Sequence, residues 1–319
     1  MSTLLESKFV GTLLGGAIGD ALGKDVEDLT EEEVRDLYGG RIENYVGPNP
    51  GETSDETTIS LLLLESILSR KRIDPYDFFQ RLYSWRLQEE KHRYPDPALL
   101  TAIDLLSAGV SLTEAGFYSC SVEGILRCTV VGLYHFNSPY VAAEGGRLVS
   151  LITHRSKEIY DTSAMLSAFV SYLVSQDSCS LSWEEALSLL HEIKSFARYP
   201  QHAKVIDRVV DLLSEGADLE DAIKTLGNST HVLEAFPLSL FIFVRRIGEP
   251  LEALYDAVNC YGPFGGDTDA VGYLVGSYLG ALHGDEIFPR HLVENLKDLS
   301  YYINSARALY QLTLNQLNI

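Results

Sequence analysis

The sequence contains few cysteines, and they follow no metal-binding or redox pattern. Cys120, Cys128, Cys179 and Cys260 are the four cysteines among 319 residues, and no two of them are spaced as Cys-x-x-Cys. A chain of this length can bury a sizeable core and does not depend on disulfides. We therefore expect four free thiols in a reducing compartment, which makes the cytoplasm the expected location.

Basic residues and long apolar runs are also scarce. The chain has 25 basic against 45 acidic residues, for a net charge of -20, so its surface repels phosphate backbones and anionic membranes. No stretch of about 18 residues lacks polar interruption, so we expect no membrane span. Residues 1–10 lack the basic segment and apolar core of a signal peptide, and we expect none.

The alternating pattern of β-strands is almost absent, and helical spacing dominates. Apolar residues three and four apart predict a helix around residues 9–22, although Gly15, Gly16, Gly19 and Gly23 are poor helix formers. Those glycines therefore predict close packing or a nearby ligand. Further helices are predicted at 31–37, 55–69, 75–87, 98–108, 121–134, 140–152, 158–175, 182–196, 201–215, 218–226, 231–247, 249–260, 268–282 and 289–316. Without a repeat or an obvious linker, the pattern favours one all-α domain over residues 1–319.

Two short acidic segments, far apart in the chain, each precede an apolar helical pattern. Residues 53–57 read Thr-Ser-Asp-Glu-Thr, and residues 265–269 read Gly-Gly-Asp-Thr-Asp. Carboxylates and hydroxyls at a helix start are hard oxygen ligands on a fixed scaffold. If the fold brings the two segments together, they could hold Mg²⁺ or Mn²⁺.

Each acidic segment also has a simpler interpretation as a helix cap. Thr53-x-x-Glu56 fits a capping box, and acids in a first turn suit the helix dipole. The second segment is more specific, because Asp267 and Asp269 straddle a helix start and only one of them can be the cap. Two carboxylates this close repel each other unless a cation lies between them.

A third acidic segment completes a resemblance to a known family. Residues 19–27 read Gly-Asp-Ala-Leu-Gly-Lys-Asp-Val-Glu. Together with residues 54–57 and 265–270, they resemble the signatures of the ADP-ribosylglycohydrolase family, namely Gly-Asp-Ala-Leu-Gly-x-x-x-Glu, Thr-Asp-Asp-Thr and Gly-Gly-Asp-Thr-Asp-Thr. Residues 121–127 also resemble that family's Gly-Asn-Gly-x-x-Met-Arg loop, and the resemblance implies that the segment around Ser121 and Gly124 cradles a phosphate; we call it the phosphate loop. The order matches, and the resemblance runs from about residue 8 to 284.

This resemblance implies a fold, a reaction and a cofactor. The fold would be a single compact orthogonal helical bundle of the family's type, with one or two Mg²⁺ or Mn²⁺ ions at the base of a cleft. Family members cleave the glycosidic bond at ribose C1″ of ADP-ribose attached to arginine, serine or other groups. The expected partner is therefore an ADP-ribosyl conjugate or a free ADP-ribose derivative, and we expect a monomer.

The resemblance also implies roles for individual residues. The metal ligands would be Ser54, Asp55, Glu56, Asp267 and Asp269. Glu27 would match a mobile glutamate near the scissile bond, and Asp55 and Asp269 would share the catalytic role with it. The substrate-binding residues would be Ser121, Gly124, His154, Gly265 and Gly266. For His154, a capping or packing role is the alternative.

Several positions depart from the family pattern. Ser54 and Glu56 stand where the family has threonine and aspartate, Ala270 replaces a threonine hydroxyl ligand, and Val122 replaces an asparagine. A non-catalytic ADP-ribose-binding or crystallin-like structural protein therefore remains an alternative. Another metal hydrolase, such as a phosphohydrolase, is a third, but the chain lacks a histidine-aspartate metal cluster and a Gly-x-x-x-x-Gly-Lys-Ser/Thr loop.

Overall fold

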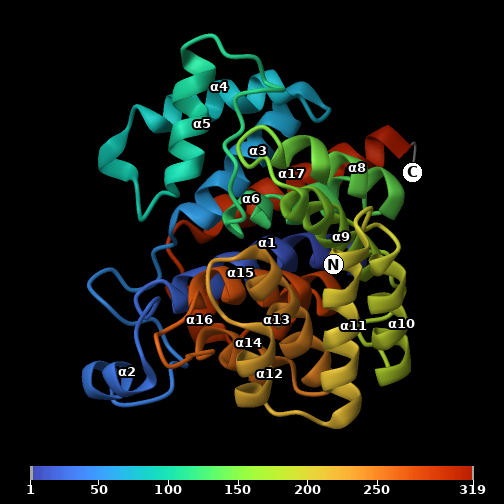
Figure 1. Ribbon diagram of the computed structural model, residues 1–319. Helices are drawn as coiled ribbons and strands as arrows, with labels where there is room; N and C mark the ends of the chain where they lie inside the picture. The colour runs from blue at the N-terminus through green and yellow to red at the C-terminus, as the bar shows by residue number, and fades with distance from the viewer. Residues whose placement is uncertain (1–2, 318–319) are drawn as a thin grey trace.

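The computed structural model describes residues 3–317, and this part of the chain is built from helices, with isolated bridges in place of β-strands (Figure 1). The all-α prediction is thus confirmed. The first helices are α1 (Leu4–Gly23), α2 (Glu31–Tyr38), α3 (Asp55–Arg70), α4 (Pro75–Arg86), α5 (Pro97–Ser107), α6 (Glu123–Leu126), α7 (Cys128–Tyr134), α8 (Pro139–Ser150) and α9 (Lys157–Val174). The others are α10 (Trp183–Lys194), α11 (Pro200–Glu215), α12 (Leu219–Leu226), α13 (Val232–Arg245), α14 (Pro250–Val258), α15 (Thr268–His283), α16 (Arg290–Asn295) and α17 (Leu299–Leu317). Two short 3-10 helices span Glu89–Lys91 and Asp285–Ile287.

Two of the predicted helices are broken in the structure. The helix expected at 121–134 is divided at Arg127 into α6 and α7. The helix expected at 289–316 is divided between α16 and α17, where Lys297 donates its backbone N–H to the Gly51 carbonyl at 2.8 Å and Asp298 adopts a φ of 57°. That tertiary hydrogen bond takes the chain out of the helical path, which periodicity alone does not reveal.

Helices α1 and α15 cross antiparallel at the centre of the molecule, although they come from opposite ends of the sequence (Figure 1). Glycines four residues apart make the contact on both sides. A Cβ added at Gly15 would lie 2.0 Å from the Gly276 carbonyl oxygen, and one at Gly19 would lie 1.9 Å from that of Gly272. Side chains there would force the helices apart, so the predicted close packing is confirmed, and the end of α1 lies beside the start of α15.

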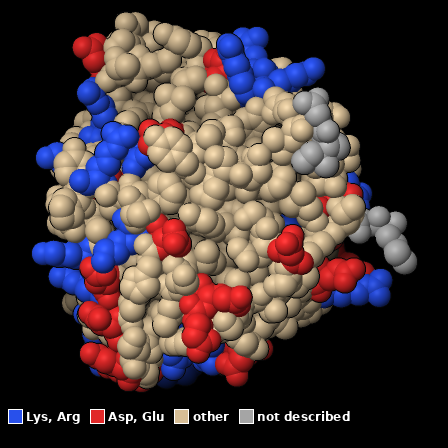
Figure 2. All heavy atoms as spheres, turned by 90° about the vertical axis from the view of Figure 1, so that its right-hand side faces the viewer, with Lys and Arg blue, Asp and Glu red and all other residues tan. Residues whose placement is uncertain are grey.

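Helices α3, α9, α13, α14 and α17 pack around this central pair. Phe169 of α9 meets Tyr278 of α15 edge-on at 5.0 Å between ring centroids, and Phe243 of α13 packs against both rings. On the face where α10 and α11 lie, charged side chains of both signs flank a broad uncharged area (Figure 2). Among residues 3–317, no helix combines the length and the apolar character that crossing a bilayer requires.

Candidate metal and active site

Asp20 joins the end of α1 to the start of α3. One oxygen of its carboxylate accepts a hydrogen bond from the Ser54 backbone N–H at 3.0 Å, and the other accepts one from the Thr57 hydroxyl at 2.5 Å. Sequence reasoning did not assign Asp20 a role. The sequence feature that could have pointed to Asp20 is an acidic residue within the apolar pattern of a helix. Burying a carboxylate there costs free energy unless it has hydrogen-bond partners.

The two acidic segments meet around Asp269. Carboxylate oxygens of Asp20, Glu56 and Asp269 all lie within 4.8 Å of one another, and so do those of Glu27, Asp267 and Asp269. We call these five residues the acid cluster. Asp269 belongs to both groups, so the two distant acidic segments meet at one shared carboxylate, to which the first segment brings Glu56 and not Asp55. Each group could hold a metal ion.

The acid cluster is strongly destabilised in its charged form. Burial raises the pKa of Asp20 to about 7, and the charge of Asp269 adds to this shift. The charge of Asp269, followed by burial, raises the pKa of Glu27 to about 9. Burial, then Asp269, holds the pKa values of Glu56 and Asp267 well above the usual range. Among the described residues, no lysine or arginine forms an ion pair with a member of the cluster.

The first acidic segment presents carboxylate oxygens without protein partners. Ser54 caps α3 by accepting a hydrogen bond from the Glu56 N–H at 3.3 Å. The Glu56 carboxylate does not return to the cap, so the capping-box interpretation of this segment is wrong. Glu56 Oε2 is buried without a hydrogen bond, as is Asp55 Oδ1, while Asp55 Oδ2 accepts one from the Arg93 N–H at 2.7 Å. Buried carboxylate oxygens without donors fit a divalent cation.

Asp55 lies next to the acid cluster without belonging to either group of three. Burial raises its pKa to about 6, although the hydrogen bond from Arg93 opposes the shift. The predicted ligand and catalytic roles of Asp55, and the ligand role of Ser54, stay predictions. The Ser54 hydroxyl already accepts the capping hydrogen bond, so a cation would use its remaining lone pair.

The second acidic segment is fixed against the Glu27–Asp28 turn by two glycines. Asp267 caps α15 by accepting a hydrogen bond from the Ala270 N–H at 3.3 Å. Gly265 has a φ of 88°, and a Cβ there would lie 2.3 Å from the Asp28 carbonyl carbon. The Asp28 N–H donates to the Gly266 carbonyl at 3.0 Å. Gly265 and Gly266 therefore let this turn bring Glu27 to Asp267, and their predicted contact with substrate stays a prediction.

The predicted phosphate loop lies at the start of α6. Gly124 packs on His154, because a Cβ at Gly124 would lie 2.7 Å from the imidazole Cγ. His154 is fully buried; its Nε2 lies 3.3 Å from an Asp96 oxygen, and burial lowers its pKa. His154 thus packs against the loop at Gly124, which agrees with the alternative that this histidine has a packing role. Ser121 is partly exposed, and its carbonyl accepts a hydrogen bond from the Gly124 N–H at 3.1 Å.

Sequence reasoning also missed Glu123, the first residue of α6. Its carboxyl is partly buried, and burial, followed by Asp96 and Asp269, raises its pKa well above the usual range. The chain has this glutamate where the family pattern has its second glycine, and that departure was the available signal. Glu123 therefore adds negative charge to the side of the site where the phosphate loop lies.

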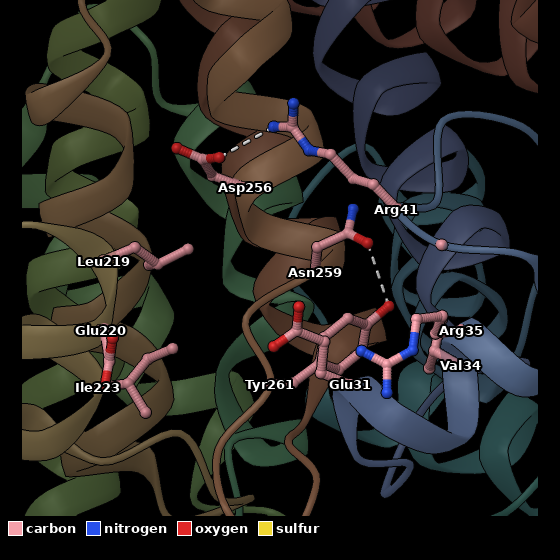
Figure 3. Close-up of a pocket in the computed structure, with 11 residues that line it drawn as sticks. Glu31, Val34, Arg35, Arg41, Leu219, Glu220, Ile223, Asp256, Asn259 and Tyr261 are labelled. Carbon is pink, nitrogen blue, oxygen red and sulfur yellow. Dashed lines mark hydrogen bonds and ion pairs between the residues drawn. The ribbon is translucent and has the colours of Figure 1, made fainter.

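A separate cavity lies apart from the acid cluster. It has a volume of about 410 Å³ and is enclosed by α2, α12 and the end of α14 (Figure 3). Arg41 forms an ion pair with Asp256 at 2.9 Å on one side of it, and Tyr261 donates a hydrogen bond to Asn259 on another. No member of the acid cluster lines this cavity. A metal ion bound by the cluster would therefore lie outside the cavity.

Comparisons with known proteins agree on one family. A sequence model described as ADP-ribosylglycohydrolase matches residues 1–318. An uncharacterised protein of Archaeoglobus fulgidus is 31% identical over 97% of each chain. The ADP-ribosylarginine hydrolase Tri1 of Serratia proteamaculans is 24% identical, over 95% of this chain and 79% of its own. A solved structure, an ADP-ribosylglycohydrolase-related protein complex, has a TM-score of 0.72 at 23% identity, covering 97% of this chain and 99% of its own, and shows the same fold.

Proposed function

Because the chain belongs to the ADP-ribosylglycohydrolase family, a family of hydrolases, we propose that it hydrolyses the glycosidic bond at ribose C1″ of ADP-ribosyl conjugates with the help of Mg²⁺ or Mn²⁺. The observation that carries this proposal is the pair of three-carboxylate groups sharing Asp269, with the buried Glu56 Oε2 left without a donor. Such a donor set is suited to a hard divalent cation.

The cluster residues would hold one or two ions. Asp20, Glu56 and Asp269 form one ligand group, and Asp267 and Asp269, with Glu27 beside them, form the other. When bound, a divalent ion would orient the ribose hydroxyls and increase the acidity of a water molecule. Ala270 contributes no side-chain oxygen to either group, so the ligands at the start of α15 are carboxylates alone.

Glu27 is the residue that we assign to proton transfer. Its carboxyl is partly exposed at the edge of the acid cluster, on the turn that Gly265 and Gly266 hold in place. Hydrolysis at C1″ passes through an oxocarbenium-like state and requires a proton for the departing atom. A Glu27 carboxyl oxygen would give that proton to the leaving group and take one from the attacking water.

Some broader properties are part of the same proposal. We propose that residues 1–319 act as one domain and as a monomer, because one chain supplies the whole acid cluster, from α1 and the turn after it, from α3, and from α15 and the residue before it. The four cysteines are free in the structure, which supports a reducing, cytoplasmic setting. Light scattering and limited proteolysis of the full chain test the monomer and the single domain.

A panel of conjugates tests the activity. Arginine-linked, serine-linked, O-acetyl and nucleic-acid-linked ADP-ribose are incubated with the protein after chelator treatment and again with added Mg²⁺ or Mn²⁺. We expect at least one conjugate to be cleaved with metal and not without it, and Asp269→Asn to lose the cleavage. Asp36→Asn, an exposed acid on α2, is the matched control. Binding of ADP-ribose without cleavage of any conjugate would instead support the non-catalytic alternative.

A further inference from the structure

Phe264, next in sequence to the second acidic segment, exposes its side chain to solvent near the acid cluster. It is 94% exposed, the highest value among the large apolar residues of 3–317. A phenylalanine side chain stabilises a protein when it is buried, and this residue makes no such contribution within the chain. A single exposed aromatic residue is ordinary, so its setting decides whether it has a use.

The backbone around Phe264 holds it in a defined place. Phe264 lies in a turn, residues 262–265, which is closed by a hydrogen bond from the Gly262 N–H to the Gly265 carbonyl at 2.8 Å. Pro263 restricts the backbone before the ring. The Asn228 side-chain amide donates to the Gly265 carbonyl at 2.7 Å and to the Cys260 carbonyl at 2.8 Å. The turn is therefore anchored at its base, and the ring projects from a fixed support.

The position of this turn relates it to one side of the site. Gly265 packs directly on the backbone of Asp28, next to Glu27, and the turn leads straight into Asp267. The phosphate loop meets the other side of residues 228–231, where the Val122 N–H donates to the Thr230 carbonyl at 2.8 Å, whereas the turn itself packs on Asp28. Phe264 thus adjoins the Glu27 side of the acid cluster.

We propose that Phe264 contacts the carrier polypeptide of an ADP-ribosylated protein, on the far side of the bond that is cut. This inference rests on the proposed function, in which Glu27 faces the leaving group and the phosphates lie at the Ser121 loop. An aromatic ring presents about 150–250 Å² of surface, which a peptide segment can cover and an acetyl group cannot. The preferred substrate class is therefore polypeptide-linked ADP-ribose rather than a small acyl adduct.

The test compares Phe264→Ala with Phe264→Tyr, which keeps the ring, and with Tyr76→Ala, a control at a 71% exposed aromatic residue on α4. Each variant is assayed with an ADP-ribosylated peptide and with O-acetyl-ADP-ribose, and its affinity for free ADP-ribose is measured by calorimetry. For Phe264→Ala, we expect the KM for the peptide conjugate to rise about tenfold more than the KM for the small adduct. The kcat values and the affinity for ADP-ribose should change little, and Phe264→Tyr should behave like the wild type.

Other results would overturn the inference in distinct ways. Equal effects on both conjugates, or weaker binding of free ADP-ribose, would mean that the ring contacts the nucleotide. An unchanged KM for the peptide conjugate would mean that the ring contacts nothing. If the wild type cleaves neither conjugate, the proposed hydrolysis is wrong, but the proposed contact between Phe264 and the polypeptide can still be tested by binding. The wild type should then bind the ADP-ribosylated peptide more tightly than ADP-ribose, and Phe264→Ala should lose that difference.

Discussion

Two buried carboxylate sites in this molecule are completed in opposite ways. Asp161, in the second turn of α9, is fully buried and accepts hydrogen bonds from the Arg198 N–H at 3.0 Å, the Tyr199 N–H at 2.9 Å and the His202 imidazole at 2.8 Å. Glu56 is nearly as buried, but its Oε2 has no donor and its neighbours are other acids.

The difference shows at which of the two sites the protein itself supplies the partners of the buried carboxylate. Buried polar groups are normally satisfied, because an unsatisfied one costs about 1–3 kcal/mol. At Asp161 the chain supplies the partners, so the site serves to connect α9 to the start of α11. The acid cluster carries negative charge for which the chain supplies no cation, so it is compensated from outside, by a bound cation or by protons. The predictions below set these two sites against each other.

The largest expected effect is on catalysis. Asp269→Asn removes the carboxylate shared by both groups of the acid cluster, and losing several kcal/mol of charge stabilisation lowers kcat at least about 100-fold. Asp161→Asn leaves the kcat of the folded protein unchanged, because its partners lie outside the acid cluster. Steady-state kinetics, corrected for the folded fraction by circular dichroism, measures both. A similar loss of kcat in Asp161→Asn would remove the functional distinction between the sites.

Metal binding should stabilise the wild type, and this stabilisation should depend on the acid cluster and not on Asp161. At a free Mn²⁺ concentration of 100 times Kd, binding to the native state alone raises the free energy of unfolding by about 2.7 kcal/mol. Asp269→Asn should lose most of this gain, and Asp161→Asn should keep it. Thermal unfolding of chelator-treated protein, with and without Mn²⁺, measures the gain. No shift in the wild type would speak against a metal site at the acid cluster.

Without metal, the two substitutions should change stability in opposite directions. Asp161→Asn should lower the free energy of unfolding by about 1–3 kcal/mol, because it weakens the hydrogen bonds from buried His202 and from two backbone N–H groups. Asp269→Asn should raise it, because it relieves the repulsion that lifts the pKa values of Glu27 and Asp20. Urea unfolding in chelator measures both, and a destabilised Asp269→Asn would contradict this account.

The smallest effect concerns pH. The folded pKa values of Asp55, Asp20 and Glu27, about 6, 7 and 9, lie above the unfolded values near 4. Their favourable contribution to metal-free stability is complete below about pH 4 and is lost as the pH rises through about 6 to 9. Glu27→Gln should reduce this loss. Unfolding of the wild type and of Glu27→Gln in chelator at pH 5, 7 and 9 measures the difference in their free energies of unfolding. A difference that does not change with pH would refute this prediction.

Much of the fold could be predicted from the sequence because local signals agreed with it. Helix periodicity, with caps such as Thr30 and Ser182, marked most of the helices. The break between α16 and α17 could not be predicted, because it depends on the hydrogen bond from Lys297 to Gly51, far away in the chain. The glycines of α1 predicted close packing, but nothing local identified α15 as the partner.

The site was predicted unevenly for the same reason. Asp267 and Asp269 were assigned because two close carboxylates at a helix start are unusual, and the resemblance to a family supplied Glu27. Asp20 was missed because its function depends on α3, and only the folded chain brings Ser54 to it. The partners of Asp161 lie about 40 residues away, so a structural aspartate and a site aspartate look alike in sequence.

The backbone contact between α1 and α15 also sets when the site can form in the cell. The Thr268 hydroxyl donates to the Gly23 carbonyl across 245 residues of sequence. At about 5–20 residues per second, a ribosome needs on the order of tens of seconds to make the intervening chain. A nascent chain that ends before residue 267 lacks both Asp267 and Asp269, so it cannot assemble the acid cluster.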